Sequence, residues 1–246
     1  MSRFTEKVSA EEFTKDSWII RDYAALLLVP LIFVVGFIMD EIPNNGLLPA
    51  MVDTSLRLLM FIAIIIIYGT MLRQHWKKFK QAWKRSVLLV IVGAIVLQIL
   101  ITVVRSFLPF HGSSVDADST TLIDPVTADF GMFIALFYLA LGPVLTALIE
   151  DIVFRYTLLG KLFHGSPHSK ISLLILNSIL FGLVHYYNFG SVVGTIPFMF
   201  AGLFLNIIYL WTRNIWHVLL IHTLNNTAIS IGGVFLVGLL RLLGVA

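Results

Sequence analysis

The chain has 246 residues, of which 58% are hydrophobic and only 13% are charged, against about 45–50% and about 25% in soluble globular domains. This composition cannot cover a water-facing surface, and it excludes a soluble enzyme, a disordered tail and a secreted disulfide scaffold. The sequence has no cysteine, which excludes a thiol nucleophile and a cysteine metal site. It therefore predicts an all-α, polytopic membrane protein.

Apolar stretches long enough to cross a bilayer, which takes about 20 residues, recur along the chain. Six of them are clear: Trp18–Met39, Leu47–Leu72, Ser86–Leu108, Phe130–Leu159, Ile171–Asn188 and Val192–Trp211. Two shorter stretches follow, Ile215–Ile229 and Gly232–Leu243, and the turn-like residues between them favour two helices over one. The expected fold is a transmembrane helix bundle of about eight spans.

Charges between the spans set the expected orientation, because Lys and Arg stay on the cytoplasmic side. Residues 73–85 hold six Lys or Arg and no acid, whereas residues 109–129 hold four Asp and no Lys or Arg. With eight spans, this pattern places both termini in the cytoplasm, and the plasma membrane is the expected location. Trp76 and Trp83 among the basic residues predict that 73–85 is an interfacial loop on anionic lipid headgroups, and no nucleic-acid partner is expected.

The chain therefore divides into three expected parts. They are a cytoplasmic N-terminal segment (1–17), N-terminal transmembrane helices (18–129) and a C-terminal transmembrane region with the candidate chemistry (130–246). Ionisable residues inside spans are costly and often functional, but some are explained by a nearby span end or an ion pair. Those are Arg21, Asp22, Asp53, Arg57, Arg105 and His217.

One cluster without such an explanation lies deep in the fourth predicted span. Asp151 and Arg155 are four residues apart, so they share a helix face and can neutralise each other. Glu150 points about 100° away and has no partner on its own helix. A buried carboxylate of this kind is a candidate general base, and a purely structural ion cluster is the alternative.

Two further clusters lie in later spans. Phe181 and His185 are four residues apart toward the end of the fifth span, where a lone His can be an ordinary helix contact. His222 and Asn226 are four residues apart and face one way, while Asn225 is expected to point elsewhere. A carboxylate, two histidines and an asparagine on three helices supply a base for water and donors for an oxyanion, which peptide-bond hydrolysis requires.

These residues, in this order, resemble the motifs of the CAAX prenyl protease and bacteriocin-processing family, also called the Abi family. Its motifs are Glu-Glu-x-x-x-Arg, Phe-x-x-x-His and His-x-x-x-Asn, which this chain matches from Glu150 to Asn226. The resemblance covers Phe130–Ala228. Asp151 departs from the pattern, because it stands where the family has its second Glu, but it should still pair with Arg155.

The resemblance implies an intramembrane endopeptidase acting on a membrane-associated peptide or precursor, such as a CAAX tail or a bacteriocin. It also implies that Glu150 and His185 activate a water molecule, and that His222 and Asn226 stabilise the oxyanion. Residues implied to support the site are Asp151, Arg155 and Phe181. No cofactor is expected, because a metal would take Glu150 as a ligand and leave no obvious base; Zn²⁺ held by Glu150, His185 and His222 is the alternative.

Two other functions fit parts of the pattern. The same scaffold could bind a partner without cleaving it, as an immunity or regulatory protein does. A small-molecule transporter also places ionisable groups at mid-membrane, although the sequence shows no internal repeat. Motifs of other intramembrane proteases, such as His-Glu-x-x-His, Gly-x-Ser-Gly and Gly-x-Gly-Asp, do not occur in the sequence.

Overall fold

The computed structural model describes residues 18–40, 47–109 and 123–244. Within these ranges every regular element is helical and no strand occurs. The elements are α1 (Ile20–Asp40), α2 (Leu47–Gln81), α3 (Trp83–Ser106), α4 (Phe130–Leu139), α5 (Leu141–Asp151), the π-helix η3 (Ile152–Leu159), α6 (Gly160–Leu162), α7 (Pro167–Leu183), α8 (Tyr186–Phe189), α9 (Val192–Thr212) and α10 (Ile215–Leu242). The segment 1–17 and two of the loop aspartates, Asp116 and Asp118, lie outside the described residues.

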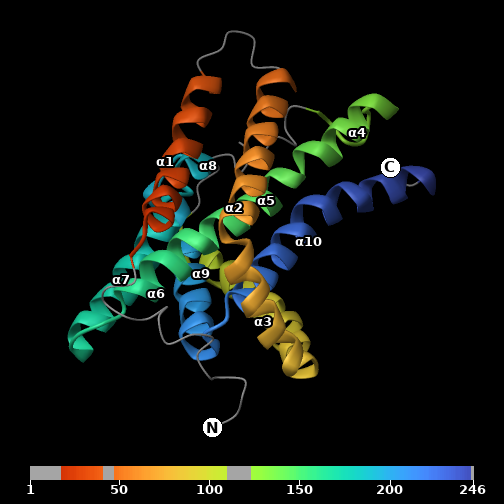
Figure 1. The fold of residues 1–246 in the computed structure, drawn as a ribbon. Helices are drawn as coiled ribbons and strands as arrows, with labels where there is room; N and C mark the ends of the chain where they lie inside the picture. Colours follow the sequence, from red (N-terminus) through yellow and green to blue (C-terminus); the bar gives the residue numbers. More distant parts are fainter. Residues whose placement is uncertain (1–17, 41–46, 110–122, 245–246) are drawn as a thin grey trace.

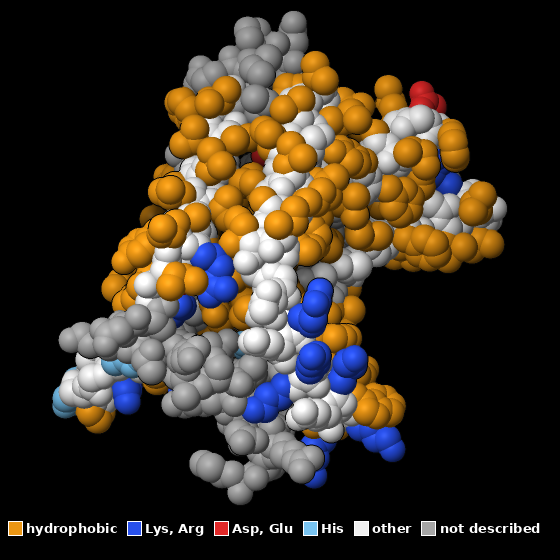
Figure 2. Space-filling model, in the orientation of Figure 1, with side chains coloured by type: hydrophobic (Ala, Val, Ile, Leu, Met, Phe, Trp, Pro, Cys, Tyr) orange, Lys and Arg blue, Asp and Glu red, His pale blue; other side chains and the backbone are white. Residues whose placement is uncertain are grey.

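The helices form a membrane bundle. Five helical segments are long and apolar enough to cross a bilayer: 47–81, 83–106, 130–162, 192–212 and 215–242. Figure 2 shows hydrophobic side chains over most of one face, while Lys and Arg gather at the end where α2 meets α3. This distribution fits helices that face lipid along their length and water at a basic end, so the all-α membrane fold predicted from the sequence is confirmed.

The last two predicted spans are a single helix, α10, of 28 residues. A turn inside the hydrocarbon would leave backbone groups without hydrogen bonds, so helix continuation is favoured even through Gly232 and Gly233. The Ser230 hydroxyl donates to the Asn226 carbonyl at 2.6 Å and so also stays within the helix. The prediction of two separate helices after residue 215 is therefore wrong.

The basic segment 73–85 is helical rather than a loop. Residues 73–81 continue α2, which has 35 residues, and α3 begins after a break at Ala82. At 1.5 Å per residue α2 is about 50 Å long, whereas the hydrocarbon is about 30 Å thick. His75 is buried, and its Nδ1 accepts a hydrogen bond from the Ile215 N–H at 3.1 Å. The basic end of α2 therefore packs against the start of α10.

Two polar residues that the sequence assigns to span boundaries are buried instead. Asp22 has 0% exposure, and its carboxylate lies 2.7 Å from the Lys161 ammonium at the end of the fourth span. His217 has 2% exposure, and its Nε2 lies 3.0 Å from the Ser86 hydroxyl of α3. Both contacts join the N-terminal helices to the region that carries the candidate site.

Candidate active site

The first site residues lie where α5 ends and η3 begins. Asp151 and Arg155 are both fully buried, and their predicted ion pair is present, with 3.0 Å between Oδ1 and Nη1. The Arg155 guanidinium also lies 3.9 Å from the centre of the Phe181 ring, a cation–π contact. The charge of Arg155 is thus balanced by a carboxylate on one side and an aromatic face on the other, which explains why Phe181 belongs to the site.

His222 of α10 lies between the two acids. Its Nδ1 is 3.4 Å from Asp151 Oδ2, and its Nε2 is 3.8 Å from Glu150 Oε2. Glu150 and His222 are both buried. Asp151 therefore contacts Arg155 and His222 together, which the spacing along one helix does not reveal. The ring of His222 links the first motif to the last.

His185 lies just past the end of α7, not inside a helix. Its N–H bonds to the Gly182 carbonyl at 3.0 Å in a tight turn, which ends the fifth span earlier than predicted. Its ring stacks on Phe198 with 4.4 Å between ring centres. His185 Nδ1 lies 3.1 Å from the Phe181 carbonyl, and a carbonyl can only accept. Nδ1 is therefore the donor, so the other nitrogen of a neutral ring is free to accept a proton.

The Asn226 side chain is hydrogen-bonded to the backbone of α5. Its Nδ2 donates to the Pro143 carbonyl at 3.0 Å, and because the amide nitrogen has two N–H groups, one remains for another acceptor. Asn225 is also buried, with its Nδ2 3.5 Å from Asn226 Oδ1. The expectation that Asn225 points away from the site is wrong.

A small pocket lies beside His222, and Glu150 is not among the residues that line it. Its polar lining comes from His185, His222, Asn225 and Asn226, and its apolar wall includes Leu97 and Ile101 of α3. Convergent polar groups beside an apolar wall are a feature of ligand sites, so this pocket is the candidate place for a reacting group.

Comparison with known proteins gives one family match. Residues 132–228 match the family model described as type II CAAX prenyl endopeptidase, Rce1-like. This match supports the resemblance to the CAAX prenyl protease and bacteriocin-processing family that the motifs carry. The matched segment contains every motif residue from Glu150 to Asn226, and it leaves out α1 to α3. No curated protein and no solved structure matches the chain.

The zinc alternative can be tested against the arrangement of candidate ligands. Within the described residues, no three His, Asp or Glu side chains are placed to hold one metal ion. Glu150, His185 and His222 are not arranged here as the three-ligand set that a catalytic Zn²⁺ uses.

Part of the site lies outside the segment that matches the family. Leu97 and Ile101 are four residues apart on α3 and form one wall of the pocket, yet α3 carries no family motif. The apolar periodicity of α3 marks a buried face, but it does not say which pocket that face borders. These residues were missed because only the crossing of α3 with α9 and α10 brings them to the site.

Proposed function

We propose that this protein is an intramembrane endopeptidase that hydrolyses a peptide bond of a membrane-associated peptide or CAAX-type precursor. The family of residues 132–228 supports this proposal at the level of the fold and of protease chemistry. The observation that carries it is the meeting of Glu150 and His222, 3.8 Å apart, next to a pocket that also contains His185 and Asn226.

In the proposed reaction, Glu150 and His185 bind a water molecule and Glu150 takes one of its protons. The water oxygen bonds to the carbonyl carbon of the scissile peptide, and the carbonyl oxygen becomes an oxyanion. N–H groups of His222 and Asn226 donate hydrogen bonds to that oxyanion. Glu150 then passes its proton to the amide nitrogen as the C–N bond breaks, which leaves a carboxylic acid and an amine.

The location and the lipid contacts belong to the same proposal. The exposed side chains of Lys77, Lys80 and Lys84 lie at the basic end of α2 and the start of α3, together with the exposed Trp83 ring. Such a combination favours the headgroup layer of an anionic, cytoplasmic leaflet. We propose that this end faces the cytoplasm, with the plasma membrane as the location.

The direct test is cleavage by purified protein in proteoliposomes, with prenylated and unprenylated CAAX peptides and a hydrophobic precursor peptide as substrates. Glu150→Gln keeps the size of the side chain but removes the base, so the cleavage rate should fall about 10²-fold or more. Asp53→Asn is the matched control, because Asp53 is an acid of the predicted second span that is paired with Arg57 and does not line the pocket. Undiminished cleavage by Glu150→Gln would refute the proposed base.

A second arm of the same assay addresses metal dependence. Protein stripped with a strong chelator should keep most of its activity, since Glu150 acts on water directly in the proposed reaction. Loss of activity on stripping, with recovery on adding Zn²⁺, would instead assign Glu150, His185 and His222 to a metal site.

A further inference from the structure

The π-helix η3 occupies a critical place in the molecule. It has eight residues, follows Glu150 and Asp151 directly, and contains Arg155. Its wide turn is visible at its end, where the Gly160 N–H bonds to the Arg155 carbonyl five residues earlier. π-Turns are rare and are often found at functional sites. The register of η3 sets how Arg155 faces Asp151, so something must hold that register.

A buried chain of side-chain amides reaches η3 from two other helices. Asn206 of α9 donates through Nδ2 to Asn177 Oδ1 at 2.9 Å and lies 3.0 Å from the Ser178 hydroxyl. Asn177 of α7 in turn donates through Nδ2 to the Phe154 carbonyl of η3 at 3.0 Å. Asn177, Ser178 and Asn206 are all buried. Because Asn206 occupies the oxygen of Asn177, the nitrogen of Asn177 is left to face η3.

Phe154, whose carbonyl accepts this hydrogen bond, also contacts the site through its ring. The Phe154 ring packs edge-on against Phe181, with 5.5 Å between ring centres. Phe181 lies against the Arg155 guanidinium at 3.9 Å and against the His222 ring at 5.8 Å. A shift of the backbone at Phe154 would therefore pass to both the buried cation and the histidine between the two acids.

We propose that Asn177 and Asn206 are positioning residues, which hold η3 in its π register and so fix Asp151 and Arg155 relative to His222. This inference rests on the proposed function only for its effect on the rate. A buried amide that merely filled the core could be replaced by Leu at a cost in stability alone. Replacing a positioning residue must also change kcat of the protein that folds.

The test compares Asn177→Leu with Ser178→Ala. The first variant removes the donor to the Phe154 carbonyl. The second removes a side acceptor of Asn206 and a donor to the Leu174 carbonyl within α7, leaves the bond to η3 in place, and serves as the control. At temperatures well below melting, kcat of Asn177→Leu should fall roughly 10- to 100-fold, since small misplacements of reacting groups have effects of this size, with little change in KM. Ser178→Ala should keep kcat within about twofold. Asn206 is one hydrogen bond further from η3, so kcat of Asn206→Leu should lie between the kcat values of the other two variants. If Asn177→Leu does not fold, Asn206→Leu takes its place in the test.

Backbone hydrogen exchange of residues 152–159 gives a readout that does not depend on activity. It should rise in Asn177→Leu and stay unchanged in Ser178→Ala. If the wild-type protein cleaves nothing, the proposed function fails, but this exchange result still tests the positioning role. Unchanged exchange, or a lowered melting temperature with unchanged kcat, would overturn the inference.

Discussion

Asp151 is the acid in this site that touches two partners of possible positive charge. It pairs with Arg155 at 3.0 Å and lies 3.4 Å from His222 Nδ1, and it is completely buried. Glu150, one residue earlier, has only the longer contact with His222. This difference supports the proposed roles, in which Asp151 balances charge within the bundle and Glu150 acts on a water molecule.

Asp151→Asn should be less stable than the wild type, because it leaves Arg155 buried without its counter-charge. Breaking a buried pair in this way costs about 3–5 kcal/mol, which should appear as a lower melting temperature in detergent and as poor yield. The contact with His222 adds an expected loss of cleavage rate in whatever protein folds. Asp151→Glu keeps the charge and should be close to wild type in both measurements.

The control is Asp53→Asn, whose partner Arg57 is part-exposed and should tolerate the change better. An Asp151→Asn protein that melts with the wild type would show that Arg155 does not depend on this carboxylate. If a well-folded Asp151→Asn were inactive while Glu150→Gln kept its activity, the roles of the two acids would be reversed.

Spacing along one helix predicts contacts within that helix, and the Asp151–Arg155 pair is an example. It does not predict contacts between helices, such as that of His222 with both acids or the amide chain from Asn206 to η3. Asn225 shows the same limit. Its angular position on α10 separates it from Asn226, but the pocket is wide enough to border both side chains. Residue types therefore reveal the chemistry, while helix crossings decide which residues share it.

Among the helices, α7 and α9 are in unusually close contact at two glycines. A Cβ added to Gly182 would lie 2.7 Å from the Met199 backbone nitrogen, and one added to Gly202 would lie 2.8 Å from the Phe181 ring. Small residues at such crossings let the helix backbones approach closely in membranes. This contact holds Phe181 and the His185 turn against α9.

Gly182→Ala should therefore destabilise the protein, since the new methyl group collides with backbone that cannot move aside. Overpacking of this kind costs about 1–3 kcal/mol, which should lower the melting temperature, and the displaced His185 should slow cleavage. Gly69→Ala is the matched control: nothing lies within 4 Å of its added Cβ, and Ala is the better helix former. Equal melting temperatures for the two variants would mean that α7 and α9 can separate at no cost.

Helix starts are better predicted than helix ends. The beginnings at Leu47, Phe130, Val192 and Ile215 agree with the structure, and polar caps explain some of them. Asp129 accepts from the Met132 N–H, and Asn214 accepts from the Trp216 N–H. The far ends of α2 and α10 were predicted too early because charged or glycine-rich residues were interpreted as breaks. Neither kind of residue stops a helix whose backbone has no better partner. The π-turn of η3 has no composition signal at all.

At the scale of the whole molecule, the helices outside the family segment are joined to the site rather than appended to it. Asp22 of α1 pairs with Lys161 directly beyond η3, and the Arg21 guanidinium reaches the Tyr156 hydroxyl at 3.3 Å. Leu97 and Ile101 of α3 close the pocket. The site is thus completed by the part of the chain in which no motif occurs, so residues 132–228 alone do not make it.

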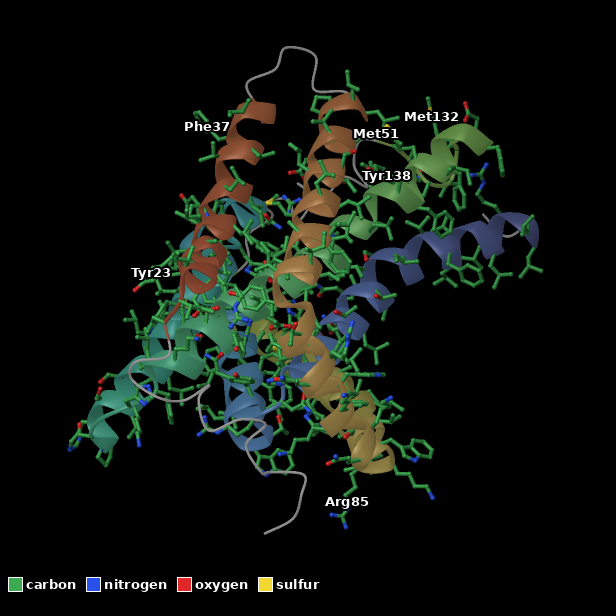
Figure 3. All side chains as sticks on the ribbon, in the orientation of Figure 1. Tyr23, Phe37, Met51, Arg85, Met132 and Tyr138 are labelled. Carbon is green, nitrogen blue, oxygen red and sulfur yellow. The ribbon has the colours of Figure 1, made fainter. Side chains whose placement is uncertain are left out.

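The arrangement of the whole molecule also predicts which ends share a side of the membrane. Figure 3 places Arg85 at the opposite end of the molecule from Phe37, Met51 and Met132. Near the C-terminal end of α10, Arg241 donates to the carbonyls of Pro125 and Ala128 at 3.1 and 2.7 Å. The end of α10 is therefore fastened to the segment before α4, on the side away from the basic end.

Single-cysteine labelling can check this, because the natural sequence contains no cysteine. Lys80→Cys, Val126→Cys and Leu243→Cys each place a thiol at an exposed position. In intact cells a membrane-impermeant maleimide should label Val126→Cys and Leu243→Cys but not Lys80→Cys, which should react only after the membrane is opened. The common side of Val126 and Leu243 follows from the Arg241 contacts, and the opposite side of Lys80 follows from the retention of basic residues in the cytoplasm. Labelling of Leu243→Cys only together with Lys80→Cys would place both ends on one side and would contradict this arrangement.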